Sequence, residues 1–168
     1  MALFTNLKFD SLRDLLINQL EDLYDAELRL VDALPKMADA ASSTELRSAF
    51  MDHLQETRGH AGRLEEIFRE LQCEPKRETC DAMKGLVKEG SAVIGADGDP
   101  TVRDAALIAA AQRVEHYEMA GYGTVRNFAH QLGLHRVAES LQHILDEEGN
   151  ADKLLTQIAE SGINAHAA

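Results

Sequence analysis

Four glutamates of this sequence stand where a helical pattern requires apolar side chains. Glu27 lies in the middle of a leucine series, and Glu56, Glu118 and Glu148 continue the apolar faces of three later segments. Each segment repeats its apolar residues at intervals of three and four, the spacing of one buried helix face. An unpaired carboxylate is costly to bury, so these groups need protons, basic partners or a cation.

The four glutamates also lie at matched distances from two predicted helix turns. Glu27 precedes the first predicted turn, near Ser42, by nearly as many positions as Glu56 follows it. Glu118 and Glu148 lie equally far before and after the second turn, at Gly133. At a rise of about 1.5 Å per residue, separations of about 14 to 15 residues place all four about 21 to 23 Å from their turns. Antiparallel packing would bring them to one level, which predicts a dinuclear metal site.

Further candidate ligands flank these glutamates. His60 follows Glu56 by four residues, Asp152 follows Glu148 by four, and Glu115 precedes Glu118 by three, so each lies one helical turn away. Oxygen-rich ligation with few imidazoles suits iron or manganese better than zinc or copper. The sequence therefore predicts a site for two iron ions, or for manganese, with these ligands: Glu27, Glu56, His60, Glu115, Glu118, Glu148 and Asp152.

Neighbouring groups are interpreted differently. His53, at the edge of the second apolar face, is taken as a hydrogen-bonded structural histidine, and whether it or Glu115 is a direct ligand stays open. Tyr24 and Tyr122 are assigned to packing, with contacts to the ligands or a redox role as the alternative, and Glu147 to a solvated face or to contacts with the ligands. The alternative for the central glutamates is a proton-sharing network without metal, which would require several strongly raised pKa values at once.

Helix punctuation indicates how these residues are positioned. The first long helix begins after Ser11, and Pro35 is expected to kink its last turns or end it early. The second opens at a capping box formed by Ser42 and Glu45 and closes at Pro75. No segment shows the alternation of a strand, so the sequence predicts an all-α fold.

The second half of the chain repeats this hairpin pattern after a connecting segment. That segment carries a short predicted helix over roughly residues 78–94. Asp99 and Pro100 then cap and start a third long helix that stops at Gly133, and a fourth runs through Ile158. One long crossover between two helical hairpins is typical of a ferritin-like four-helix bundle, here a single predicted domain over residues 1–168.

Composition narrows the function classes. The chain has 17 basic and 29 acidic residues, a net charge of −12, which argues against nucleic-acid binding. No apolar stretch approaches the roughly 20 residues of a membrane span. Cys73 and Cys80 form no zinc pattern, and the first ten residues show no secretory signal, so we expect a reducing, cytoplasmic location.

Several segments resemble the YciE/YciF family of bacterial ferritin-like stress proteins. They include LYDAE at Leu23–Glu27 and, most specifically, VEHYEMAGYGT at Val114–Thr124. The likeness extends from about Leu15 to Ile158. It implies a ferritin-like bundle, a homodimer and a link to the stress response, in a family without a well-defined biochemical activity.

Two function hypotheses follow, and whether the protein is an enzyme stays open between them. The first is a non-haem di-iron or di-manganese protein whose metal is oxidised by oxygen or peroxide. The second is a structural or interaction protein whose inherited metal site is idle. Iron storage inside a protein shell is a weaker third hypothesis, since nothing in the sequence specifies a cage.

Overall fold

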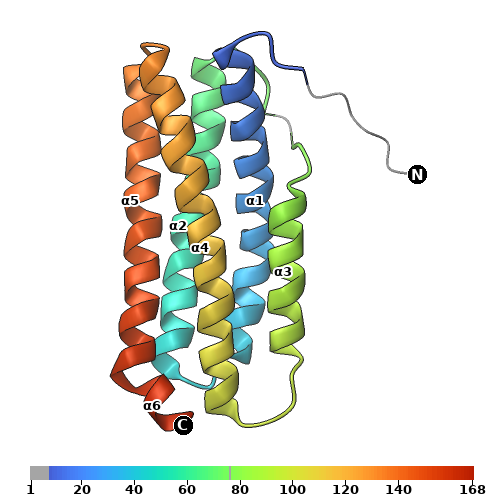
Figure 1. Ribbon diagram of the computed structural model, residues 1–168, viewed down its shortest axis with the longest axis vertical. Coiled ribbons are helices and arrows are strands. Elements are labelled where there is room, and N and C mark those ends of the chain that lie inside the picture. Colours follow the sequence, from blue (N-terminus) through green and yellow to red (C-terminus); the bar gives the residue numbers. More distant parts are fainter. Residues whose placement is uncertain (1–7, 76) are drawn as a thin grey trace, which may run out of the picture.

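The computed structural model describes residues 8–75 and 77–168, which form a bundle of long helices with a shorter helix at its edge (Figure 1). In this view α1 and α5 run down the bundle and α2 and α4 run up it, and the shorter helix α3 packs against α1 and α4. The elements are α1 (Leu12–Ala40), α2 (Thr44–Glu70), α3 (Asp81–Ile94), α4 (Pro100–Gln131), α5 (His135–Ile158), the π-helical turn η1 (Ala159–Ile163) and α6 (Asn164–His166).

The all-α prediction is confirmed, because the described residues contain helices and no strand. Two helical hairpins, α1 with α2 and α4 with α5, are joined by a crossover that carries α3, an arrangement consistent with a ferritin-like bundle (Figure 1). In the part of the chain that the structure covers, no helix combines the length and apolar composition that a membrane span needs.

Helix starts follow the predicted caps with one correction. Ser11 caps α1 by accepting a hydrogen bond from the Asp14 amide, and Asp99 caps α4 with Pro100 in its first turn. The prediction that Ser42 caps α2 is wrong, because Ser43 accepts from the Leu46 amide instead. The side chain of Ser42 is drawn away by a buried carboxylate on α4, to which its hydroxyl donates.

The prolines affect the first hairpin less than predicted. Pro35 does not end α1, which continues to Ala40 with Met37 and Ala38 buried in the core. The cost of a proline in a helix interior, about 3 kcal/mol, is offset here by burial of that last turn. Likewise α2 ends at Glu70, before Pro75, in a turn where Gln72 adopts a positive φ of 56°.

The apolar core is divided into two clusters along the bundle axis. One cluster includes Leu30 and Leu54, and the other includes Leu23 and Leu64. On each of the four long helices, the residues between the two clusters include at least one buried acidic or histidine side chain. A polar layer therefore crosses the middle of an otherwise apolar bundle, and the residues predicted from the sequence to have chemistry lie in it.

The crossover is anchored to α1 by a buried carboxylate. Asp25, only 1% exposed, accepts hydrogen bonds from Arg29 at 2.5 Å, from the amide of Cys80 at 2.9 Å and from Arg77. Burial by itself would raise the pKa of Asp25, but the hydrogen bonds from Arg77, Arg29 and Cys80 outweigh it and hold this pKa below its usual range. Asp25 thereby fixes the start of α3 beside α1.

We expect Asp25→Asn to destabilise the protein by about 2 to 3 kcal/mol at neutral pH, because an amide cannot replace a carboxylate that accepts from two guanidinium groups. Since the pKa of Asp25 is lower in the folded protein, its stabilising effect is complete above the ordinary carboxyl pKa and is lost as the pH falls through the folded value. Urea denaturation of both proteins at pH 7 and near pH 3 measures this. A stability difference that stays constant over that range would contradict the assignment.

Candidate metal centre

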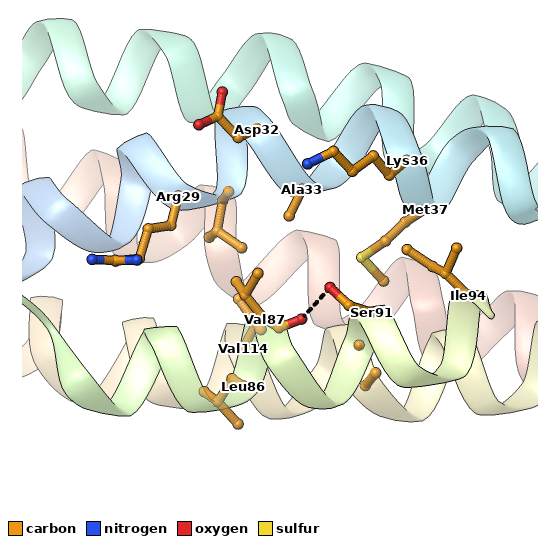
Figure 2. Close-up of a pocket in the computed structure, with 13 residues that line it drawn as sticks. Arg29, Asp32, Ala33, Lys36, Met37, Leu86, Val87, Ser91, Ile94 and Val114 are labelled. Carbon is orange, nitrogen blue, oxygen red and sulfur yellow. Dashed lines mark hydrogen bonds between the residues drawn. The ribbon is translucent and has the colours of Figure 1, made fainter. Parts of the chain in front are cut away.

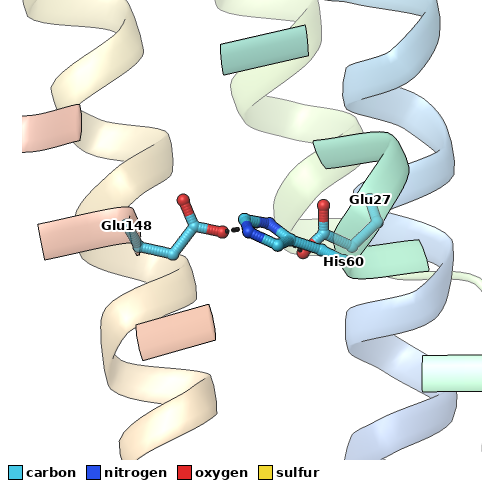
Figure 3. A group of neighbouring side chains, drawn as sticks. All are labelled: Glu27, His60 and Glu148. Atoms are coloured by element: carbon cyan, nitrogen blue, oxygen red, sulfur yellow. Dashed lines mark ion pairs between the residues drawn. The ribbon is translucent and has the colours of Figure 1, made fainter. Parts of the chain in front are cut away.

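One group of potential ligands joins three helices at the polar layer. It consists of Glu27 from α1, His60 from α2 and Glu148 from α5, all fully buried (Figure 3). The Nδ1 atom of His60 lies 3.0 Å from Oε1 of Glu148 and 3.4 Å from Oε1 of Glu27. One ligand atom from each residue lies within 4.8 Å of the others, which is close enough to share one cation.

A second group lies beside the first and shares Glu148 with it. It adds His53 from α2 and Glu115 from α4, both buried. The Nε2 atom of His53 lies 3.4 Å from Oε1 of Glu115 and 3.7 Å from Oε2 of Glu148. Because Oε1 of Glu148 faces His60 and Oε2 faces His53, this carboxylate is placed between the two groups. Glu148 is therefore common to both groups.

Glu118 on α4 contributes another carboxylate to the same layer. It is fully buried, and neither of its oxygens has a hydrogen-bond partner among the described residues. Burial raises the pKa of Glu118 well above its ordinary value, and the nearby charges of Glu27, Glu148 and Glu115 raise it further. Glu118 is therefore a candidate ligand beside both groups, although it belongs to neither three-residue cluster.

Buried polar atoms without hydrogen bonds are concentrated at this site. Buried polar groups in proteins are nearly always hydrogen-bonded, so each exception requires a physical reason. Within the part of the chain that the structure describes, the unpartnered atoms of the layer are Oε2 of Glu27, Nε2 of His53, Nδ1 of His60, Oε2 of Glu115 and both carboxylate oxygens of Glu118 and Glu148. Lone pairs converging on one buried volume fit a pair of cations, so the residues present suit a carboxylate-rich dinuclear metal centre.

The electrostatics of the layer lead to the same interpretation. Burial raises the pKa of Glu27 and, more strongly, that of Glu115. Burial alone would lower the imidazole pKa values, but the surrounding carboxylates raise the pKa of His53 to about 9 and that of His60 to about 11. Without metal, the cluster therefore retains protons that a cation would replace.

Residues outside the cluster orient its two imidazoles. Nε2 of His60 lies 3.0 Å from Oε2 of Glu147, whose carboxylate is held by Arg63, and this contact turns Nδ1 inward. On the other side, Nδ1 of His53 lies 3.2 Å from Oε2 of Glu56, which turns Nε2 inward. A carboxylate behind a ligating histidine fixes its tautomer and increases its basicity. The two histidines thus share one mode of support.

The prediction that Glu56 points into the bundle is wrong. Its side chain is 46% exposed, and the following residue, Thr57, occupies the inward position. The depth predicted for Glu56 agrees with the polar layer, which lies between His53 and His60 on α2. The direction predicted for the Glu56 side chain does not agree with the structure. The buried face of α2 is centred on Thr57, and a residue one position away is rotated by about 100° around the helix axis.

Asp152 is also placed away from the cluster. Its side chain is 20% exposed, accepts a hydrogen bond from Gln112 at 3.1 Å and lies 3.3 Å from Nε2 of His116. Glu56 and Asp152 therefore lie outside the cluster. The structure brings together the other five predicted ligands, which are Glu27, His60, Glu115, Glu118 and Glu148.

Three residues of the site have functions that the sequence left open. His53 belongs to a ligand group, Glu147 supports His60, and the hydroxyl of Tyr122 donates a hydrogen bond to Oε1 of Glu27. The available signal for His53 was its spacing, since it precedes His60 by seven residues, or about two helical turns, and so shares its face. For Glu147 no periodic signal exists, because its partner lies on another helix.

Comparisons with known proteins agree with this architecture. The family described as "Domain of unknown function (DUF892)" matches residues 11–168. The chain is 43% identical to Protein YciF of Escherichia coli (strain K12) over 162 residues, which is 96% of this chain and 98% of that protein. The crystal structure of the E. coli stress protein YciF superposes with a TM-score of 0.89, covering 93% of this chain and 99% of that one.

Two further solved structures are similar. YcfI from Rhodopseudomonas palustris, described as a candidate structural protein, is 38% identical with a TM-score of 0.87 and covers 91% of this chain and 98% of its own. A protein from Xanthomonas campestris pv. campestris is 20% identical with a TM-score of 0.74, covering 93% and 96% of the two chains. At that identity the likeness concerns the fold alone.

Proposed function

The chain belongs to the DUF892 family, and from this premise and its layer of buried acids we propose that it is a metalloprotein that binds two iron or manganese ions between its four long helices. Glu27, His60 and Glu148 would hold one ion, and His53, Glu115 and Glu148 the other. The proposal depends mainly on eight buried ligand atoms that converge on one volume and have no hydrogen-bond partner among the described residues. Two of these atoms belong to Glu148, which both groups share.

The chain's own residues would bind the ions, orient the ligands and exclude water. When bound, an iron or manganese pair supplies redox chemistry toward oxygen or peroxide. Apolar clusters above and below the layer limit access of water to it. The hydroxyl of Tyr122 donates its proton in a hydrogen bond to Oε1 of Glu27, which leaves Oε2 of that carboxylate as its free donor atom.

A second function keeps the same fold and leaves the site idle. The description of the R. palustris relative as a candidate structural protein supports this alternative, in which the chain is a structural or interaction protein. In either case, the description of E. coli YciF as a stress protein supports a role in the stress response. We extend the proposal to a cytoplasmic homodimer, following the reducing location expected from the sequence and the family resemblance.

Metal loading distinguishes the two functions. We expect chelator-treated protein to be stabilised by Fe²⁺, under anaerobic conditions, or by Mn²⁺, because a cation replaces the repulsion among buried carboxylates. At a free metal concentration of about 1,000 times Kd, each site contributes about 4 kcal/mol, so one filled site raises the Tm by about 8 to 16 °C and two filled sites by about twice as much. Differential scanning calorimetry measures the shift, and elemental analysis should give about two ions per chain.

The control is Mg²⁺ at the same concentration, which prefers oxygen and water to imidazole and should stabilise far less. A Tm unchanged by iron and manganese, with less than about 0.1 ion per chain, would support the idle site.

A further inference from the structure

The two halves of the proposed centre differ in their access to solvent. His60, Glu27 and Tyr122 are completely buried, and the outer nitrogen of His60 is covered by Glu147. The guanidinium group of Arg63 binds Glu147 and places a positive charge outside this half. A cation that approached from this side would meet Arg63 first.

The other half lines a cavity of about 120 Å³ between α2 and α5. His53 and Glu115 lie at its inner end, apolar side chains such as Ala151 and Leu155 form its walls, and no lysine or arginine is among its lining residues. The cavity between α1 and α3 provides a contrast, because it is lined by Arg29 and Lys36 and contains neither cluster histidine (Figure 2). Of these two cavities, the one between α2 and α5 joins an acidic lining to the proposed centre.

Carboxylates of decreasing exposure line the path through the α2–α5 cavity to Glu148. Asp52 is exposed, Glu56 is 46% exposed, the side chain of Glu115 is 3% exposed and Glu148 is fully buried. The first three line the cavity, and Glu148 lies directly beyond them, within reach of His53. Such a series offers a cation successive ligands as it loses water.

An independent observation shows that the inner end is built for a ligand. Oε2 of Glu115 and Nε2 of His53 are buried and have no hydrogen-bond partner among the described residues, although both side chains line the cavity. A volume of about 120 Å³ is well above the minimum of about 10 to 15 Å³ that one water molecule needs. A partly hydrated divalent ion fits this space.

We propose that the cavity between α2 and α5 is the path by which a divalent cation reaches the centre, and that the His53–Glu115–Glu148 group is occupied first. This inference rests on the proposed function, since it requires a centre to fill. A low-dielectric pocket lined by the carboxylates of Asp52, Glu56 and Glu115, with His53 as its one basic side chain and no lysine or arginine, concentrates cations and accelerates their association. The same field repels anions, so the path selects for a metal cation over an anionic substrate.

Two substitutions outside the ligands test the path, with Co²⁺ as the probe because its visible absorption reports ligation. Asp52→Lys reverses the charge at the cavity mouth, and Ala151→Leu narrows the cavity. Their matched controls are Glu70→Lys, at the far end of α2, and Ser91→Leu, which enlarges a side chain in the cavity between α1 and α3. All five proteins are mixed with CoCl₂ in a stopped-flow spectrometer and then titrated to equilibrium.

We expect Asp52→Lys to slow Co²⁺ association about fivefold at low salt. The difference from the wild-type rate should become small near about 0.5 M salt, because salt screens the electrostatic field at the cavity mouth. Ala151→Leu should slow it by about tenfold or more at every salt concentration, since the obstruction is steric. Both variants should still reach the wild-type cobalt content, and both controls should load within about twofold of the wild-type rate.

The outcomes separate the path from the centre itself. If wild-type protein binds no Co²⁺ at equilibrium, the proposed function and the path both fail. If all five proteins fill to the same extent and at the same rate, the centre stands and the path is overturned. Equal slowing by Asp52→Lys and Glu70→Lys would also overturn the path, because it would reflect net charge rather than the cavity mouth.

Discussion

Replacing Glu148 with glutamine is expected to abolish tight metal binding at both positions of the centre. Glu148 places one oxygen toward His60 and the other toward His53, so it is the residue common to both ligand groups. Loss of an outer residue that supports a ligand lowers metal affinity about 10-fold to 100-fold, and loss of a shared ligand should exceed that. Isothermal titration with Mn²⁺ should therefore show an affinity reduced by more than about 100-fold at both sites.

The stability of the metal-free form of Glu148→Gln provides a second readout. Glutamine has nearly the same shape as glutamate and removes one buried carboxylate from a layer that contains Glu27, Glu115 and Glu118. The charge of Glu148 raises the pKa values of these neighbours, so its removal relieves repulsion, but it also removes a carboxylate that raises the pKa values of His60 and His53. Because these two effects oppose each other, the apo variant should stay within about 1 kcal/mol of apo wild type.

The matched control is Glu139→Gln, an exposed position on the same helix, which should change neither metal affinity nor stability. Two bound ions retained by Glu148→Gln would exclude this residue as the shared ligand.

Replacing Asp104 with alanine is expected to destabilise the fold by about 3 kcal/mol, without changing metal stoichiometry. Asp104 is buried on α4 and accepts hydrogen bonds from the Ser42 amide at 2.9 Å, from the Ser42 hydroxyl at 2.5 Å and from the Ser43 amide at 2.8 Å. These bonds tie the turn of the first hairpin to the second hairpin. Hydrogen bonds to a charged acceptor contribute about 1.5 to 3 kcal/mol each, and water reaching the turn restores part of the loss.

Calorimetry should find the Tm of Asp104→Ala lowered by about 6 to 12 °C, since 1 kcal/mol corresponds to about 2 to 4 °C in a chain of this size. Asp39→Ala, at an exposed position near the end of α1, is the control and should remain within about 0.5 kcal/mol of wild type. An equal loss in both variants would show that the effect arises from charge rather than from the tie between hairpins.

Local sequence signals predicted most of the fold because they act within a few residues. Ser11, Asp99 and Gly133 mark helix boundaries through side chains and backbone angles that depend on their neighbours in the chain. The errors occurred where distant contacts decided the outcome. Ser42 is drawn from its capping role by Asp104, which lies 62 residues away, and Pro35 is kept inside α1 by the burial of the turn that follows it.

The sequence by itself determined where along the bundle axis the site lies and most of its acidic residues. Glu27, Glu118 and Glu148 interrupt apolar faces at equal distances from two turns, and both signals follow from the 3.6-residue period and the helical rise. Periodicity locates the buried face of a helix only to within about one residue, which is about 100° of rotation. It could therefore not decide which of two neighbouring residues on α2 points into the bundle.

Only the tertiary structure decided which α2 side chains complete the centre. Packing of α2 against α1 and α5 sets its rotation, which turns His53 and His60 inward and leaves Glu56 behind His53 as its support. The contacts of Glu147 with Arg63 and His60 likewise join different helices. Such roles depend on the relative rotation of helices far apart in the chain, a property that no local spacing encodes.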